Sequence, residues 1–238
     1  MREKFITGQI YHILNRGVDK RKIFLDDGDY LRFIHDLFEF NNTEPVNNLT
    51  YYFRKIQYKD SASPYIITQE RKERVKRKLL VEILAFCLLP NHYHLLLQPL
   101  LDGGVVKFIT KLNMGYAKYF NEKYERNGVL FQGRYKSILV NKESHFIHLP
   151  YYIHLNALDL KFPGWRNKEI ENYKAAMRFL ENYRWSSFPD YIGIKNFPSI
   201  TQREFLLKLF GESEQYKKDT LEWLKEMDLE EIKAVALE

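Results

Sequence analysis

The sequence predicts an α+β fold of the ferredoxin-like class: one antiparallel sheet with helices mainly on one face, plus a helical C-terminal extension. Apolar patterns along residues 9–158 follow the order strand, helix, strand, strand, helix, strand, helix. The two central runs, residues 81–89 and 92–98, are separated only by Pro90 and Asn91, which indicates an antiparallel hairpin at the centre of the sheet.

The individual elements follow from patterns in chain order. Residues 9–14 predict a strand containing His12, and residues 27–40 predict an amphipathic helix because apolar side chains recur there at three-and-four spacing. Residues 105–124 repeat this helical pattern, and residues 134–140 predict a further strand.

The last helix of this series covers residues 142–158 and contains Pro150. A proline inside a helix removes a backbone hydrogen bond at a cost of roughly 3 kcal/mol, so a kink is expected there. Alternatively the helix is broken, and a new segment carries Pro150 in its first turn.

Two segments lie outside this pattern. Residues 41–80 are interpreted as an insertion, and its basic stretch at residues 71–78 would face solvent or DNA. Residues 201–238 predict two short acidic helices. We therefore expect a domain of residues 1–193, insertion included, and an acidic helical appendage of residues 194–238.

Composition and charge favour a globular protein with an anionic partner. The chain has 238 residues, 45% of them hydrophobic and 16% aromatic, and a net charge of +6. Residues 201–238 carry six Lys or Arg against ten Asp or Glu, a balance of −4, which leaves +10 on residues 1–200. A basic body of this kind is the electrostatic footprint expected of a nucleic-acid binder.

The single cysteine, Cys87, excludes an internal disulfide and a multi-cysteine zinc site, and it lies in an apolar run as a small core residue would. The sequence shows no secretory signal and no apolar stretch long enough to span a membrane, so we expect a cytoplasmic protein.

Candidate chemistry begins with the histidine pair after Pro90. On a strand, His92 and His94 point to one face and Tyr93 to the other. Two neutral imidazoles on a rigid support suit a divalent cation and leave positions open for substrate oxygens. A pair of hydrogen-bonded structural histidines fits this tripeptide equally well.

A second group of candidates lies on the predicted helix 142–158. Tyr152 and Asn156 are four residues apart and so share one helical face. Asn156 can offer a carbonyl oxygen to a hard cation, and the phenol of Tyr152 becomes a nucleophile when deprotonated. Tyr151 has Leu155 at the same offset and is the weaker candidate.

These motifs resemble those of the HUH single-tyrosine transposases, specifically the REP-associated tyrosine transposase branch. The resemblance covers about residues 8–193 and rests on the order and spacing of five short motifs: Tyr11-His12-Ile13-Leu14-Asn15-Arg16-Gly17, Pro90-Asn91-His92-Tyr93-His94, Phe131-Gln132-Gly133-Arg134-Tyr135-Lys136-Ser137, Tyr152-Ile153-His154-Leu155-Asn156 and Trp185-Ser186-Ser187. Two positions depart from the family pattern: Pro150 lies inside the predicted helix, and Ala157 stands where relatives tend to carry a proline.

The resemblance implies an HUH endonuclease fold and a transposase that cleaves and transfers single-stranded DNA through a 5′-phosphotyrosine intermediate. Tyr152 would be the nucleophile, and Mg²⁺ or Mn²⁺ would be held by His92, His94 and Asn156. The target would be hairpin-forming repeat DNA, and a homodimer is possible. Phosphate contacts are expected from three basic residues, Arg16, Arg134 and Lys136.

Two other functions remain open from the sequence. One is a DNA- or RNA-binding regulator that keeps the fold without cleavage, which Pro150 makes conceivable. The other is a zinc hydrolase with a water nucleophile, which ranks last because the motifs lack a nearby Glu or Asp as a base. If the histidines are ligands, metal affinity and activity should fall below about pH 6.

Overall fold

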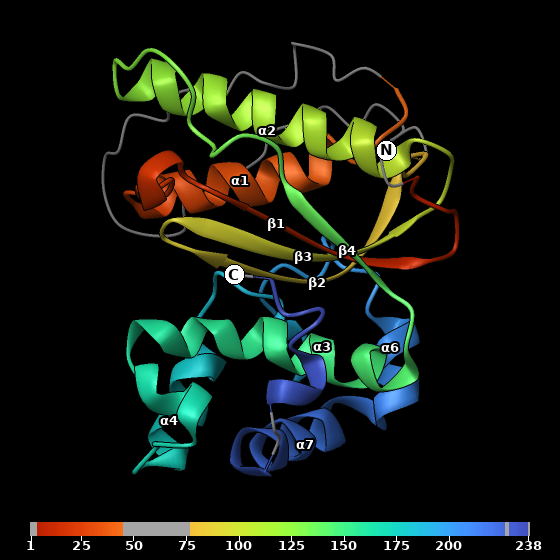
Figure 1. Ribbon diagram of the computed structural model, residues 1–238, viewed down its shortest axis with the longest axis vertical. Coiled ribbons are helices and arrows are strands. Elements are labelled where there is room, and N and C mark those ends of the chain that lie inside the picture. The colour runs from red at the N-terminus through yellow and green to blue at the C-terminus, as the bar shows by residue number, and fades with distance from the viewer. Residues whose placement is uncertain (1–3, 45–76, 227–228, 238) are drawn as a thin grey trace.

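The computed structural model describes residues 4–44, 77–226 and 229–237. Within these ranges a four-stranded sheet has the order β2-β3-β1-β4, with antiparallel neighbours throughout (Figure 1). The strands are β1 (Ile10–Arg16), β2 (Val81–Leu89), β3 (His92–Pro99) and β4 (Lys136–Val140). The predicted fold class, a ferredoxin-like α+β sandwich with a helical C-terminal extension, is confirmed.

The predicted hairpin of β2 and β3 is present, but only β3 lies in the interior of the sheet. β2 is the edge strand, and a later segment of the chain covers its outer side. Leu88 N–H donates to Trp185 O at 2.9 Å, and Ser187 N–H donates to Phe86 O at 3.0 Å. Because an uncovered edge strand exposes unpaired backbone groups, this segment allows an apolar strand to lie at the edge.

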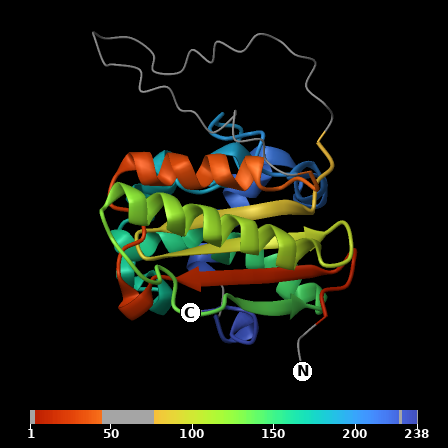
Figure 2. The same ribbon diagram turned by 90° about the horizontal axis from the view of Figure 1, so that it is seen from above.

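One face of the sheet is covered by α1 (Asp27–Glu39) and α2 (Gly104–Lys123), which lie side by side (Figure 1, Figure 2). α1 begins with a capping box, in which the side chains of Asp26 and Asp29 each accept a backbone N–H of the other. Lys123 of α2 pairs with both carboxylates, at 2.8 and 2.7 Å. The predicted helix boundaries differ from the observed ones by at most one residue.

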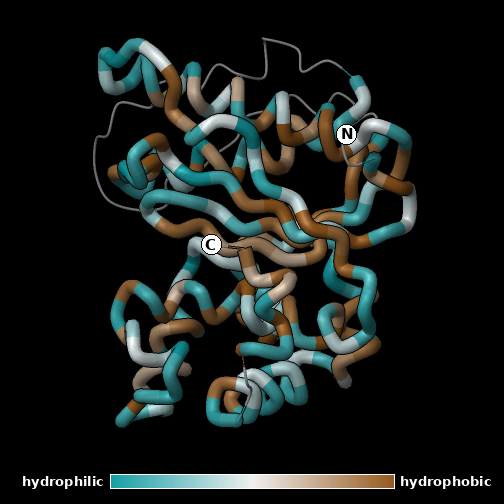
Figure 3. The backbone as a smooth tube through the Cα atoms, in the orientation of Figure 1, coloured by the Kyte–Doolittle hydropathy of each residue, from teal (hydrophilic) through white to brown (hydrophobic). Residues whose placement is uncertain are grey.

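The opposite face is also covered by helices, which corrects the expectation of helices mainly on one face of the sheet. α3 (Glu143–Leu155) and the 3-10 helix η3 (Asn156–Leu160) contact β2, with α4 (Tyr173–Asn182) beyond them (Figure 1). Residues 83–89 of β2 are all buried, as expected for a strand covered on both faces. Hydrophobic residues accordingly run along the strands between the two helical layers (Figure 3).

α3 continues through Pro150 as one helix, so the alternative of a break at this proline is wrong. Pro150 has no N–H to donate to the carbonyl of Phe146 four residues earlier, and the helix tolerates this loss. The predicted helix 142–158 instead ends at Leu155, where the chain tightens into η3.

The predicted C-terminal helices are α6 (Glu204–Phe210) and α7 (Glu212–Glu226), followed by the 3-10 helix η5 (Leu229–Ile232). Through Tyr216, α7 contacts α3: the ring stacks on Tyr151 at 4.7 Å, and the hydroxyl lies 2.9 Å from His154 Nδ1. Residues on both sides of position 193 share one buried apolar cluster, and a domain boundary there stays a prediction.

Most of the predicted insertion, including its basic stretch up to residue 76, lies outside the described residues. Its two described ends, residues 41–44 and 77–80, lead from α1 into β2. In the described part of the chain, no helix is long and apolar enough to cross a membrane.

Asn41 joins the two ends of this insertion. Its Oδ1 accepts the N–H groups of Leu80 and Val81 at 3.0 and 3.1 Å, and its Nδ2 donates to Val81 O at 2.8 Å. Asn41→Ala would leave these buried backbone groups without partners, so we expect a loss of about 2–4 kcal/mol in the free energy of unfolding. Urea denaturation measures this loss.

The matched control is Asn42→Ala. Asn42 Oδ1 accepts the exposed Glu44 N–H at 3.3 Å, a contact that water can replace. Its stability should stay within about 0.5 kcal/mol of the wild type. Equal losses in the two variants would contradict the role given to Asn41.

Candidate active site

β3 places the two predicted histidines on one face of the sheet. His92 and His94 alternate with Tyr93, and their ring centroids lie 5.0 Å apart. Tyr93 points to the opposite face, where its hydroxyl donates to Asn113 Oδ1 of α2 at 2.7 Å. The predicted alternation is therefore observed, and on the face that His92 and His94 share, His94 contacts Tyr152 of α3.

A third histidine, His12 of β1, joins this pair. His12 Nε2 lies 2.9 Å from His94 Nδ1, and His12 Nδ1 lies 2.6 Å from the backbone oxygen of Val235. His12 and His94 are buried, and His92 is half-buried. From the sequence, His12 is expected in a strand and has no predicted role, because only the pairing of β1 with β3 brings it beside His94.

These contacts determine which ring nitrogens carry protons. A carbonyl oxygen only accepts, so in a neutral ring His12 Nδ1 donates to Val235 and His12 Nε2 is an acceptor. His94 Nδ1 therefore donates to His12, which leaves a lone pair on His94 Nε2. That nitrogen is buried, and no group in the described part of the chain hydrogen-bonds to it. A buried acceptor of this kind calls for a ligand or a functional role.

His92 offers a second lone pair beside the first. Its Nδ1 lies 2.6 Å from Asn91 Oδ1, which accepts the proton and leaves His92 Nε2 free to coordinate. Burial, and to a smaller extent the charge of Arg16, lowers the pKa of His92 to about 4. Burial also lowers the pKa of His12 to about 4 and that of His94 well below 6.5. All three rings are therefore neutral at pH 7.

Tyr152 of α3 lies against the histidines. Its ring centroid is 6.3 Å from that of His94 and 6.4 Å from that of His12, both in edge-to-face geometry. The side chain is fully buried. Tyr151 instead stacks on Tyr216 of α7, so the helix presents Tyr152 to the histidines.

Arg166, to which the sequence analysis gave no role, contacts the hydroxyl of Tyr152. It lies in the 3-10 helix η4 (Pro163–Asn167), and its Nη1 is 3.3 Å from Tyr152 Oη. Nη2 and Nε donate to the carboxylate of Asp159 at 2.8 and 3.1 Å. No local sequence pattern marks this arginine, because its position depends on the packing of η4 against η3.

Asn156 is held between Arg166 and the helix. Its Oδ1 accepts from Arg166 Nη2 at 2.7 Å, and its Nδ2 donates to the backbone oxygen of Tyr152 at 2.8 Å. The sequence predicted this Oδ1 as a metal ligand beside His92 and His94. In the observed arrangement one lone pair of this oxygen accepts from a guanidinium cation, and the role of Asn156 as a metal ligand stays a prediction.

The three predicted phosphate-binding residues line one pocket of about 280 Å³. Arg16, Arg134 and Lys136 form it together with Leu14, Asn15 and Gln132. In the register of the sheet, Arg16 lies opposite His92, so the pocket adjoins the histidine pair. Positive side chains therefore line the approach to His92, as expected for a path that binds phosphates.

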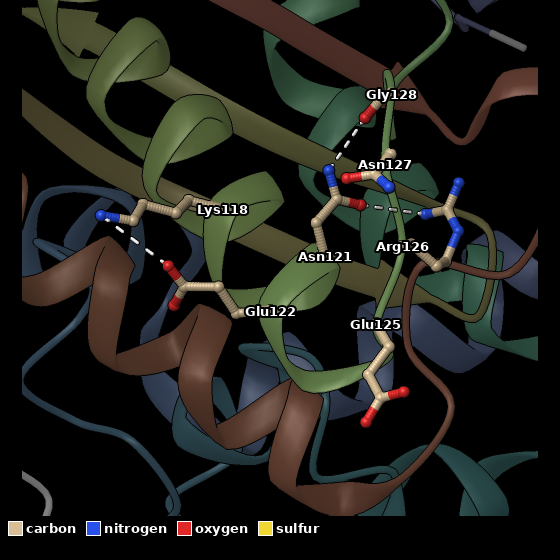
Figure 4. A pocket seen from close by; sticks show the side chains of 7 residues that line it. All are labelled: Lys118, Asn121, Glu122, Glu125, Arg126, Asn127 and Gly128. Atoms are coloured by element: carbon tan, nitrogen blue, oxygen red, sulfur yellow. Dashed lines mark hydrogen bonds and ion pairs between the residues drawn. The ribbon is translucent and has the colours of Figure 1, made fainter.

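A larger pocket of about 560 Å³ lies at the carboxyl end of α2 (Figure 4). Its lining is polar, with Asn121 donating to Gly128 O at 2.8 Å and Lys118 3.8 Å from Glu122. It contains none of the predicted site residues. Volume alone therefore does not locate the candidate site in this fold.

The other histidines near Tyr152 in sequence connect α3 to its neighbours. His148 Nδ1 accepts from Trp223 Nε1 at 3.1 Å. His154 bonds through its two ring nitrogens to Tyr216 Oη and Ser187 Oγ, at 2.9 and 2.7 Å. Both residues thus hold α3 against the C-terminal part of the chain.

In the described ranges, no group of three or more His, Cys, Asp or Glu side chains is arranged to hold a metal ion. The free lone pairs of His92 Nε2 and His94 Nε2 nevertheless fit two positions in the shell of a divalent cation. The remaining positions would be left to water or to oxygens of a substrate.

The fold and the site together define an α+β protein that sets a histidine pair beside a buried tyrosine. Residues 54–156, which include both histidines, Tyr152 and Asn156, match the family described as IS200-like transposases. Over that part of the chain, this match agrees with the family expected from the motifs.

A solved structure described as the REP-associated tyrosine transposase bound to a REP hairpin is similar to this chain at 13% identity and a TM-score of 0.47. The alignment covers 83% of this chain and 88% of the other. No curated protein matches the sequence.

The buried neutral histidines predict a loss of stability in mild acid. Burial lowers the pKa of His12 to about 4 and that of His154 to about 3, against about 6.5 in the unfolded chain. Between pH 6.5 and 4 the unfolded chain therefore binds more protons, and the free energy of unfolding falls as the pH falls. Each ring contributes a loss of roughly 2–3 kcal/mol at pH 4.

Thermal denaturation at pH 7, 6, 5 and 4.5 measures this effect, and the points at pH 6 and 5 lie above the ordinary pKa values of carboxylates. His154→Gln lowers stability at pH 7 but should flatten the dependence on pH. A melting temperature that is constant between pH 7 and 4.5 would show that these rings are not buried as neutral groups.

Proposed function

We propose that this protein is a transposase that cuts and rejoins single-stranded DNA through Tyr152, with Mg²⁺ or Mn²⁺ as cofactor. The observation that supports this best is the buried, unpartnered His94 Nε2 beside Tyr152. The family match adds that this pair lies in a segment of the transposase type. The expected target is a hairpin-forming repeat, as the family resemblance implies.

His92 and His94 would hold the metal ion through Nε2. When bound, the ion polarises the scissile phosphate and offsets the charge that develops on it. Asn156 Oδ1 already accepts from Arg166 in this arrangement, so we assign the other positions to phosphate oxygens and water.

Tyr152 would attack the phosphate in line. A bond forms between Tyr152 Oη and phosphorus, and the bond from phosphorus to the 3′ oxygen breaks. The electron pair goes to the 3′ oxygen, which takes up a proton, while the phenol proton passes to water. The product is a 5′-phosphotyrosine with a free 3′-hydroxyl, and reversal of the step rejoins the strand without ATP.

The DNA would reach this centre along Arg16, Arg134 and Lys136. Their shared pocket adjoins His92, and phosphate contacts of this kind position a strand without reading its bases. Tyr152 lies beside the histidines of its own chain, so a homodimer is not needed to bring these groups together.

One observation favours the alternative, a DNA- or RNA-binding regulator that does not cleave. The side chain of Tyr152 is fully buried, and the backbone of Val235 bonds to the histidine cluster. In this conformation a phosphate cannot reach the hydroxyl, so cleavage requires the C-terminal segment or η4 to move.

Labelled single strands from the DNA flanking the gene, incubated with protein and Mg²⁺ or Mn²⁺, separate the two functions. The transposase predicts a labelled protein band on a denaturing gel that a chelator abolishes. The alternative predicts specific retention of the same strands on a native gel without a covalent band under either metal.

A further inference from the structure

Arg166 is positioned at the candidate nucleophile by several contacts at once. Its Nη1 lies 3.3 Å from Tyr152 Oη, and its Nη2 lies 2.7 Å from Asn156 Oδ1. The guanidinium carbon also lies 5.5 Å from the centroid of the Tyr152 ring. One guanidinium therefore touches both residues that the sequence singled out on the predicted helix 142–158.

The orientation of this guanidinium is fixed by Asp159. The carboxylate accepts from Arg166 Nε and Nη2, and its Oδ1 also accepts from Trp165 Nε1 at 2.6 Å. The guanidinium in turn lies 4.6 Å from the centroid of the Trp165 ring. A fork of donors held in this way loses little conformational entropy when it binds an anion.

The charge of Arg166 matters because attack by tyrosine places negative charge on the phenol oxygen and on the phosphate. Burial lowers the pKa of Arg166, but the hydrogen bonds and charge interactions with Asp159 and Tyr152 together raise it above its usual value, so Arg166 keeps its proton. The N–H groups that do not bond to Asp159 face two neutral groups, the hydroxyl of Tyr152 and the amide oxygen of Asn156.

We propose that Arg166 is a catalytic residue that holds Tyr152 Oη for attack and neutralises the charge developing on the phenol oxygen and the scissile phosphate. Asn156 and Asp159 are then positioning residues that orient Arg166. This inference rests on the proposed function of Tyr152. It assigns Asn156 to the arginine rather than to the metal ion.

Single-turnover formation of the covalent adduct tests the proposal. Arg166→Ala should slow the reaction about 100-fold, the usual effect of removing one donor to a developing charge. The affinity for the DNA should change less than about threefold, because the contact strengthens only in the transition state. Arg166→Lys and Asp159→Asn should form the adduct at rates between those of Arg166→Ala and the wild type. These two variants keep the test valid if Arg166→Ala does not fold.

Chemical rescue separates a catalytic from a structural role. The Arg166 side chain is 24% exposed, so methylguanidine can enter the space that Arg166→Ala leaves, and adduct formation should recover about tenfold. Arg184→Ala is the matched control, because Arg184 stacks on Trp185 outside this site and should give neither slowing nor rescue. Adduct formation by Arg166→Ala at the wild-type rate, or a loss that methylguanidine does not restore, would overturn the proposal.

Mn²⁺ affinity, measured by electron paramagnetic resonance without DNA, tests the role of Asn156. Asn156→Ala should bind Mn²⁺ as the wild type does if Asn156 orients Arg166. An affinity reduced as strongly as in His94→Ala would assign Asn156 to the metal instead.

A measurement that needs neither DNA nor metal separates failure of this inference from failure of the proposed function. In nuclear magnetic resonance spectra of protein labelled with ¹³C-tyrosine, the signal of Tyr152 is identified as the one missing from the spectrum of Tyr152→Phe. In Arg166→Ala this tyrosine should ionise at a pH about one unit higher or more, because a cation in contact favours the phenolate. If the wild type forms no adduct, the proposed function fails, and this signal still decides whether Arg166 acts on Tyr152.

Discussion

Replacing Tyr152 by phenylalanine should abolish the covalent protein–DNA adduct while the protein still folds and retains DNA. The substitution removes only the hydroxyl that would form the bond to phosphorus. Loss of a nucleophile lowers the rate by at least about 10³-fold. The ring keeps its edge-to-face contacts with His12 and His94 and loses the 3.3 Å contact of its hydroxyl with Arg166, so the protein should still fold, with a melting temperature lower by about a few degrees. A denaturing gel with labelled DNA and a melting curve measure the two effects.

Tyr151→Phe is the matched control in the same helix. Tyr151 is nearly as buried, but its ring stacks on Tyr216, and its hydroxyl makes a 3.5 Å contact to Asp219. Its adduct should form at close to the wild-type rate. An adduct that persists in Tyr152→Phe and disappears in Tyr151→Phe would move the nucleophile to Tyr151 and contradict the site described here.

Replacing His94 by alanine should remove metal binding and, with it, cleavage. His94 Nε2 carries the lone pair that the hydrogen bonds through His12 leave free, and without it only His92 Nε2 remains of the two proposed histidine ligands. We expect Mn²⁺ affinity to fall by at least about 100-fold and adduct formation by about 10³-fold. Titration calorimetry with Mn²⁺ measures the first effect without DNA.

Two further variants make this result specific. His12→Gln should weaken Mn²⁺ binding by about 10–100-fold, because it removes the partner that fixes the tautomer of His94. His35→Gln, on α1 at the opposite face of the sheet, should have no effect. Mn²⁺ affinity that is unchanged in His94→Ala would identify the histidines as a structural cluster and favour the binding-only function.

The sequence determined those features that depend on local periodicity. Alternation along a strand places His92 and His94 on one face, and four-residue spacing along a helix places Tyr152 and Asn156 together. The hairpin after residue 80 and the two long helices follow from patterns of the same kind, and all of them are observed. These features depend only on backbone geometry, which a short stretch of sequence is enough to specify.

Only the tertiary structure decided which distant residues meet. His12 joins the pair through the register between β1 and β3, and Val235 and Arg166 reach the site from segments far along the chain. The helical layer over the second face, and the position of β2 at the edge, likewise follow from contacts across the whole chain.

The change in interpretation of Asn156 has the same physical origin. Its spacing from Tyr152 fixes where the amide lies, but whether its oxygen faces a metal ion or a guanidinium depends on the packing of η4. Local sequence sets the face of each side chain. The partner on that face is set by long-range packing, to which no periodicity in the sequence corresponds.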